Sequence, residues 1–205
     1  MEPSIILDAA QTVFAEEGMA GASVRAIARR AGCDPALLYY HFENKEQIFT
    51  ALLERKFKVL VPRLQSVAQS RASTRQKLDQ IIEALAEYVK DDAGFRAVVR
   101  GQIVQGAESV TPHLVDPLRQ VHEALSDVFA QGLASGELRA DLQAPIVAFL
   151  FAGTYLEIQD LVPALSPHMP HLPDQPMLPL AERMWLDLFW RGIANPEPPS
   201  RRPRS

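Results

Sequence analysis

The side chains best suited to binding chemistry in this chain lie between Ser23 and Lys45. Arg25 carries a planar fork of donors that matches a phosphate or the edge of a guanine. Tyr39 and Tyr40 offer hydroxyl groups and flat faces, and Lys45 places an ammonium beside the free amides of a predicted helix start. Together these groups suit the binding of anions and base edges, and no nucleophile with a neighbouring base accompanies them.

Two short helices joined by a sharp turn are predicted to hold these groups. Ser23 is placed to cap the first helix, and Gly32 supplies the turn that follows it. Asp34 caps the second helix, which begins at Pro35, where a missing N–H costs nothing. We interpret this stretch as a helix-turn-helix whose second helix enters a groove of DNA.

The second of these helices is only about two turns long, so packing must hold it in place. Leu38 and Phe42 are four residues apart and are expected to anchor it inward. The outward residues are then Ala36, Leu37, Tyr39, Tyr40 and His41. For one of the two tyrosines packing is an open alternative, and His41 suits capping or packing as well as DNA contact.

Helical periodicity continues through the rest of the chain and predicts an all-α fold of about nine helices. A first helix is expected from Pro3 to Glu17, closed by Gly18. Asn44 caps a fourth helix, with Gln47 three residues on as in a capping box. Prolines are expected to mark breaks or helix starts, and these are Pro62, Pro117, Pro145 and Pro179. The prolines from 163 to 179 suggest an extended crossing, read as a stiffened loop with a docking motif as the alternative.

The composition fits a packed protein with no general attraction for nucleic acid. Of 205 residues 47% are hydrophobic and 22% are charged, and the net charge is −4. The first fifty residues contain four cationic and seven acidic residues, so DNA binding is expected to show a shallow dependence on salt. The single cysteine, Cys33, excludes an internal disulfide and is read as structural, with a redox switch as the alternative.

Residues 5 to 53 resemble the DNA-binding domain of the TetR family of bacterial transcriptional regulators. The resemblance lies in Ser-Val-Arg-Ala-Ile-Ala from Ser23, Ala-Gly at 31–32, Leu-Tyr-Tyr-His-Phe from Leu38 and Asn-Lys-Glu from Asn44. It implies a homodimer in which a larger helical domain pairs through its last two helices and often holds a small effector. It also implies DNA contact by Arg25, Ala36, Leu37, Tyr39, Tyr40, His41 and Lys45, to which the small Pro35 is added on steric grounds.

Two residues depart from the family pattern. Leu37 stands where a small hydroxyl residue is frequent, so it suits a thymine methyl rather than a phosphate. Asp34 places an acidic group beside the expected groove. The stretch is therefore predicted to read shape and methyl groups more than to clamp phosphates.

The later helices predict a ligand site and a dimer interface. Polar residues among apolar stripes are weak candidates for ligand contact, and they are Arg100, Gln102, His122, Tyr155 and Gln159. The helices from Ile146 to Ile158 and from Leu180 to Ile193 are more apolar than one core requires. The predicted interface residues are Phe149, Leu150, Leu156, Met184, Trp185, Leu188 and Phe189.

We therefore expect a DNA-binding repressor released from its operator by a small apolar or amphipathic ligand, with a regulator that needs no small effector as the alternative. A helical enzyme is disfavoured, because no nucleophile, phosphate-loop or metal-site spacing is present. The predicted domains are residues 1–47 for DNA, 48–194 for effector and dimerisation, and 195–205 as a disordered tail. No cofactor, metal or membrane partner is expected, and the location is expected to be cytoplasmic.

Overall fold

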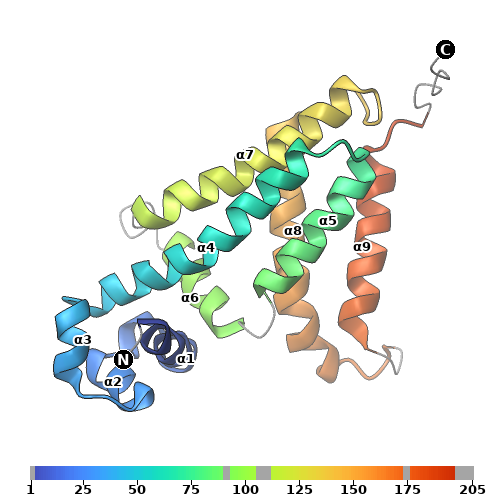
Figure 1. Cartoon of the computed structure of the whole chain (residues 1–205). Helices are drawn as coiled ribbons and strands as arrows, with labels where there is room; N and C mark the ends of the chain where they lie inside the picture. The colour runs from blue at the N-terminus through green and yellow to red at the C-terminus, as the bar shows by residue number, and fades with distance from the viewer. Residues whose placement is uncertain (1–2, 90–92, 105–111, 173–175, 197–205) are drawn as a thin grey trace. The chain divides into compact units, whose positions relative to one another are not determined.

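The computed structural model describes residues 3–89, 93–104, 112–172 and 176–196. These residues form α-helices without a strand, apart from one isolated bridge between Leu138 and Ala194, which confirms the predicted all-α fold. The helices, drawn in Figure 1, are α1 (Pro3–Gly21), α2 (Val24–Ala31), α3 (Pro35–His41), α4 (Lys45–Gln69), α5 (Thr74–Val89), α6 (Ala93–Val104), α7 (Pro112–Ala134), α8 (Ala144–Leu165) and α9 (Met177–Ile193), with a short 3-10 helix at Ser166–His168.

The chain divides into two compact units. The first comprises Met1–Arg63 and Leu85–Gln120, and the second comprises Leu64–Ala84 and Val121–Ser205. Helices α4, α5 and α7 each contribute residues to both units. The predicted domain limits at residues 47 and 194 are functional divisions and stay a prediction.

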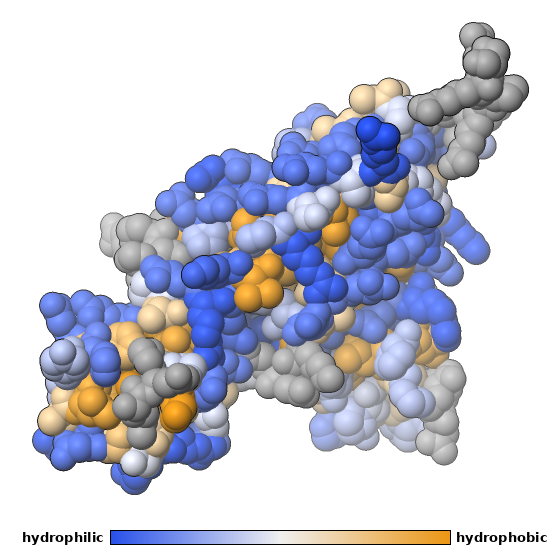
Figure 2. Space-filling view, in the orientation of Figure 1, coloured by the Kyte–Doolittle hydropathy of each residue, from blue (hydrophilic) through white to orange (hydrophobic). Residues whose placement is uncertain are grey.

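The first unit is built around the apolar faces of α1, α2, α3 and the first half of α4. Phe14 of α1 is fully buried, and its ring lies edge-to-face on Phe49 of α4 with centroids 5.3 Å apart. Ile27 and Leu38 bring the inner faces of α2 and α3 into the same core, each with no exposed surface. In Figure 2 the region of these helices shows hydrophobic residues rimmed by hydrophilic ones. Aromatic and aliphatic burial thus stabilises two helices that are too short to persist alone.

The second unit has an aromatic centre where α7, α8 and α9 meet. Phe151 of α8 lies 5.8 Å from Phe129 of α7, 5.0 Å from Trp185 of α9 and 5.2 Å from Phe189 of α9, between ring centroids. Tyr155 extends the group one turn further along α8, 5.6 Å from Trp185. These contacts hold α8 and α9 side by side as neighbouring helices (Figure 1).

Two charged side chains join the helix ends of the second unit. The ammonium of the buried Lys77 donates to the carbonyl of Ala68 at 2.8 Å, in the last turn of α4, and to Gln131 Oε1 at 2.6 Å. The carboxylate of Glu137 accepts the N–H of Thr74 at 2.8 Å, at the start of α5. Both satisfy groups that a helix end leaves without an internal partner.

Prolines break the helices less than the sequence predicts. Pro62 was predicted to kink or end its helix. It does not end α4, which continues to Gln69. Pro62 is exposed while Val61 and Leu64 are buried, so water can satisfy the carbonyl that loses its partner while the apolar face continues. The predicted helix start at Pro117 is also wrong. Helix α7 begins at Pro112, because the buried Leu114 extends its apolar face before Pro117.

The C-terminal helices also begin and end differently from the predictions. Pro145 lies in the first turn of α8 as expected, whereas α9 begins at Met177, two residues before Pro179. The extended crossing predicted from residue 163 is wrong at its start, because Pro163 lies within α8 and a 3-10 turn follows. Residues 173–175 of that crossing lie outside the described part of the chain.

Asn195, the first residue of the predicted tail, is hydrogen-bonded within the second unit. The backbone N–H of Asn195 donates to the carbonyl of Glu137 at 2.8 Å, and its side-chain amide donates to that of Gly136 at 3.0 Å. These bonds hold Asn195 beside the turn that follows α7, so the tail prediction is wrong for this residue. Residues 197–205 lie outside the described part of the chain.

One stretch, Ala144–His168, is long and apolar enough to cross a bilayer by length and composition alone. The predicted helix from Ile146 to Ile158 continues in the structure through Leu161 to Leu165. A core helix of a soluble protein has the same length and composition, so the stretch is weak support for a membrane span.

Candidate nucleic-acid interface

The predicted helix-turn-helix forms from the residues that were expected to shape it. The Ser23 hydroxyl accepts the N–H of Ala26 at 3.2 Å and caps α2. Gly32 ends α2 in the left-handed conformation with φ 69° and ψ 33°, which favours glycine. Asp34 accepts the N–H of Ala36 at 2.8 Å and caps α3, whose first residue is Pro35. The acidic group of Asp34 is thus used within its own helix start.

Helix α3 presents an aromatic outer surface. Leu38 is fully buried and anchors the helix, whereas Phe42 is half-buried and caps it, donating its N–H to the carbonyl of Leu38 at 2.7 Å. The side chain of Tyr40 is 82% exposed and that of Tyr39 is 55% exposed, so both tyrosines face outward. The ring of His41 lies 5.1 Å from that of Tyr40, edge-to-face. The predicted exposure is confirmed, and contact of these residues with DNA stays a prediction.

The arginines of α2 are exposed, but one of them is already paired. Arg25 and Arg29 lie on the surface of α2, whereas the guanidinium of Arg30 pairs with the carboxylate of Glu16 on α1 at 2.9 Å. Arg25 lies in the first turn of α2, next to the buried Val24 that fixes that turn. Among the described arginines of α2, Arg25 and Arg29 therefore have no ion pair with an acidic side chain.

The remaining small or apolar candidates lie along the start of α3. Ala36 is exposed, and Pro35 and Leu37 are half-buried. The first turn of α3 therefore has small side chains beside the exposed tyrosines. Contact of these residues with bases stays a prediction.

Lys45 has a role that its position in the sequence did not reveal. Its ammonium donates to the carbonyls of Met19 at 2.8 Å, Ala22 at 3.1 Å and Ala20 at 3.4 Å. Met19 and Ala20 lie in the last turn of α1, beyond the break at Gly18 with φ 68°, and Ala22 lies in the connector to α2. Lys45 therefore fixes the entry to the helix-turn-helix from the start of α4, and its predicted phosphate contact stays a prediction.

The start of α4 is capped by the predicted residues, with one changed partner. Asn44 accepts the N–H of Gln47 at 2.8 Å, as a helix cap should. The side chain of Gln47 reaches back to Glu43 instead of Asn44, accepting the Glu43 N–H at 2.9 Å and donating to its carboxylate at 3.0 Å. The cap holds Lys45 in position for its contacts with the connector.

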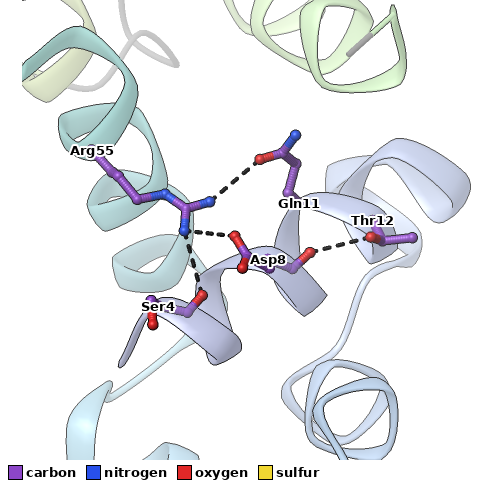
Figure 3. A network of polar contacts seen from close by, with 5 residues as sticks. All are labelled: Ser4, Asp8, Gln11, Thr12 and Arg55. Carbon is purple, nitrogen blue, oxygen red and sulfur yellow. Dashed lines mark hydrogen bonds and ion pairs between the residues drawn. The ribbon is translucent and has the colours of Figure 1, made fainter. Parts of the chain in front are cut away.

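A second link joins α4 to α1 at Arg55, further along α4 than Lys45 (Figure 3). The guanidinium of Arg55 donates to Asp8 at 2.7 Å, and to the Ser4 carbonyl and Gln11 Oε1 at 3.4 Å each. Asp8 is 71% exposed at its side chain, so the ion pair adds little to stability on its own. Its value is geometric, because three points on α1 are held by one side chain of α4.

The predicted ligand residues separate into different settings. The Tyr155 hydroxyl and the Gln159 amide both donate to Glu182 of α9, the former at 3.2 Å, and both side chains are buried. His122 contacts the carbonyl of Pro145 at 2.9 Å, and its ring lies 4.1 Å from that of the predicted interface residue Phe149. Two of the five candidates therefore converge on Glu182.

The other two ligand candidates belong to α6. Arg100 is exposed there, and the side chain of Gln102 lies outside the described residues. Glu182 is not among the predicted ligand residues. Its sequence signal is an acidic residue that interrupts the apolar pattern between Pro179 and Trp185.

The predicted interface residues divide into exposed and packed ones. Phe149, Leu150, Met184 and Leu188 are 54–68% exposed, and Ile146, Leu161 and Leu165 of α8 are 46–54% exposed. Trp185 and Phe189 are half-buried and pack on Phe151, and Leu156 is half-buried. A row of large apolar side chains is thus left uncovered on α8 and α9.

The described part of the chain has no group of three or more His, Cys, Asp or Glu side chains that could hold a metal ion. Cys33 is a free, half-buried thiol at the turn between α2 and α3. The exposed ion pair of Asp141 with Arg139 lowers the pKa of the Asp141 carboxyl below its usual value. None of these features adds a reactive centre to the helices that carry the exposed tyrosines.

Residues 6–52, which contain the helix-turn-helix, match the family described as bacterial regulatory proteins, tetR family. Its helix-turn-helix is that of the TetR family of bacterial transcriptional regulators. The chain is 26% identical to the fatty acid metabolism regulator protein of Bacillus subtilis over 149 residues, which are 73% of this chain and 77% of that protein. It is 27% identical to the transcriptional repressor KstR2 of Mycobacterium tuberculosis over 143 residues, 69% of this chain and 72% of the relative.

The similarity of fold to solved transcriptional regulators extends beyond the helix-turn-helix. The transcriptional regulator FadR from Bacillus subtilis in complex with stearoyl-CoA has a TM-score of 0.76 to this chain, at 23% identity, over 94% of this chain and 100% of that one. The match of the helix-turn-helix to this family and the curated relatives identify the chain as a soluble DNA-binding transcriptional regulator and not an enzyme, as predicted.

Proposed function

We propose that this regulator binds operator DNA by placing α3 in the major groove. The observation that carries the proposal is the pair Tyr39 and Tyr40, outward on a short helix that Leu38 anchors in the core. Arg25 and the small residues at the start of α3 extend the same surface toward phosphates and base edges. The DNA-contacting set is Arg25, Pro35, Ala36, Leu37, Tyr39, Tyr40 and His41, with Lys45 holding the connector behind it.

The working unit is a homodimer formed by α8 and α9. Phe149 is 68% and Leu188 65% exposed, and large apolar side chains in such a row favour burial against a second copy. A twofold pair places two recognition helices on half-sites about 34 Å apart, one turn of DNA. Residues 1–47 then serve as the DNA-binding domain and residues 48–194 as the dimerisation and effector domain, working in the cytoplasm.

The regulator acts as a repressor that a long-chain acyl thioester releases from DNA. Support comes from the relatives, which include a regulator of fatty acid metabolism and a FadR structure holding stearoyl-CoA. An acyl-CoA is amphipathic, which agrees with buried polar groups such as Tyr155 and Gln159 set among apolar residues in the second unit. The ligand must bind the DNA-free conformation more tightly, since only differential affinity shifts the population.

Fluorescence anisotropy on a DNA fragment selected by the protein tests this function. Stearoyl-CoA is expected to release the fragment at micromolar concentration, whereas coenzyme A alone leaves the complex intact. Stearate, used below its micelle concentration, separates recognition of the chain from recognition of the thioester.

Tight DNA binding that none of these compounds changes would overturn the acyl-thioester proposal. It would favour the alternative of a regulator controlled without a small effector. Loss of DNA binding in Tyr39→Ala with retained stearoyl-CoA binding would support the division of roles between the two parts of the chain.

A further inference from the structure

The first turn of α6 meets α1 at a point where only a glycine fits. A Cβ atom built on Gly94 would lie 2.5 Å from the Cβ of Ala15, 2.7 Å from its Cα and 2.9 Å from its carbonyl oxygen. Two of these three atoms belong to the backbone of α1, so no rotation of a side chain can relieve the contact. The distance between the two helices is therefore set by the absence of a side chain at residue 94.

The contact between Gly94 and Ala15 joins α6 to α1, and each of these helices is bonded to a further helix of the first unit. On one side, the guanidinium of Arg96 in α6 donates to the carbonyl of Val89, the last residue of α5. On the other side, Glu16 follows Ala15 directly and pairs with Arg30 of α2 at 2.9 Å. A displacement at the α5–α6 corner thus reaches the helix-turn-helix through Ala15 and the adjacent ion pair.

This route does not use α4. The Arg55 link from α4 contacts Ser4, Asp8 and Gln11, which lie in the first half of α1, whereas Gly94 meets the second half. Helix α1 is therefore held at two points by two different helices. A change at one point with the other fixed tilts α1 and the helices attached to it.

We propose that Gly94 is a positioning residue for DNA binding, whose close contact with Ala15 sets the orientation of the helix-turn-helix on α6. The inference rests on DNA binding through α3. A methyl group at residue 94 forces α1 away from α6 and shifts α2 and α3 with it. Two recognition helices at a fixed spacing then no longer fit their half-sites together.

The chain provides a matched control in the same helix. Gly101 has no neighbour within 4 Å of a built Cβ, so Gly101→Ala adds a methyl group to α6 without a contact. Both substitutions raise the helix propensity of α6 in the same direction. Their difference therefore measures the contact with Ala15.

The test compares the full-length wild type, Gly94→Ala and Gly101→Ala for DNA affinity by anisotropy and for thermal unfolding by circular dichroism. Gly94→Ala is expected to lower the affinity for the selected DNA about tenfold, an ordinary size for linked sites. Its helical signal at room temperature is expected to match that of Gly101→Ala, while its melting temperature is expected to be lower by about 2–12 °C, because overpacking costs about 1–3 kcal/mol.

A double variant separates positioning from general damage. Ala15→Gly removes the nearest of the three atoms, so Ala15→Gly combined with Gly94→Ala is expected to recover part of the lost affinity. Hydrogen exchange without DNA is expected to be faster in α2 for Gly94→Ala than for Gly101→Ala. That measurement separates failure of this contact from failure of the proposed DNA binding.

Equal affinities of Gly94→Ala and Gly101→Ala, with equal exchange in α2, would overturn the proposal. A loss of affinity that merely follows an equal loss of folded protein, or two independent effects in the double variant, would overturn it as well, since a purely structural contact predicts these results.

Discussion

Lys45→Met is the substitution that distinguishes a clamp from a phosphate contact. Methionine keeps much of the length of the side chain and its packing but removes the ammonium. The carbonyls of Met19 and Ala22 then lose donors at 2.8 and 3.1 Å, and the connector before α2 loses its link to α4. The expected result is a loss of stability that DNA is not needed to reveal.

The size of the effect follows from the contacts. A hydrogen bond from a charged donor contributes about 1.5–3 kcal/mol. Lys45 is half-buried, and water replaces part of what its carbonyl partners lose. We therefore expect the free energy of unfolding to fall by about 2 kcal/mol, close to the value of one such bond. For a chain of this size that corresponds to a melting temperature lower by about 4–8 °C.

Urea unfolding followed by circular dichroism measures this change, and anisotropy at several salt concentrations measures DNA binding. Lys58→Met, at an exposed position of the same helix, is the control and is expected to unfold like the wild type. A Lys45→Met protein as stable as the control, with a salt dependence of DNA binding reduced by about one phosphate contact, would refute the clamp.

Three further predictions concern the anchor, the cap and the pairing surface. Leu38→Ala removes the fully buried anchor of α3 and is expected to cost about 2–5 kcal/mol in urea unfolding; a smaller loss would mean that α3 is held otherwise. Asn44→Ala removes the cap of α4 and is expected to cost about 1 kcal/mol by the same measurement, and no loss would contradict the capping role. Leu188→Asp, at a side chain 65% exposed, is expected to leave the fold intact and give a monomer by sedimentation velocity, and a persistent dimer would place the interface elsewhere.

The helix-turn-helix could be predicted from the sequence because its signals are local. The cap at Ser23, the left-handed turn at Gly32 and the helix start at Asp34 each depend on a few neighbouring residues. Burial of Leu38 and exposure of Tyr40 follow from spacing on a short helix.

Contacts between distant segments could not be predicted in this way. Lys45 lies 23 residues or more from the carbonyls it binds, and a lysine at a helix start equally suits a phosphate. Gly94 looks like an ordinary helix breaker until Ala15 is placed beside it.

Proline was overvalued as a sign of helix ends. Pro62 and Pro163 both lie on exposed helix faces, where water can reach the carbonyl that a proline leaves without a donor. The neighbouring buried residues of α4 gain enough by continuing the helix to offset the lost bond. The position of a proline alone is therefore a poor predictor of a helix end where packing favours continuation of the helix.

Selection of bound DNA from random sequence, by the wild type, Tyr39→Ala and Arg25→Ala, tests the central claim most directly. The wild type is expected to enrich a twofold-symmetric site with half-sites about ten base pairs apart. Tyr39→Ala is expected to lose base preference if it reads bases, whereas Arg25→Ala weakens all sequences alike if it contacts phosphate. Failure of the folded wild type to enrich any sequence, or enrichment of the same site with equal affinity by all three proteins, would contradict DNA recognition through α3.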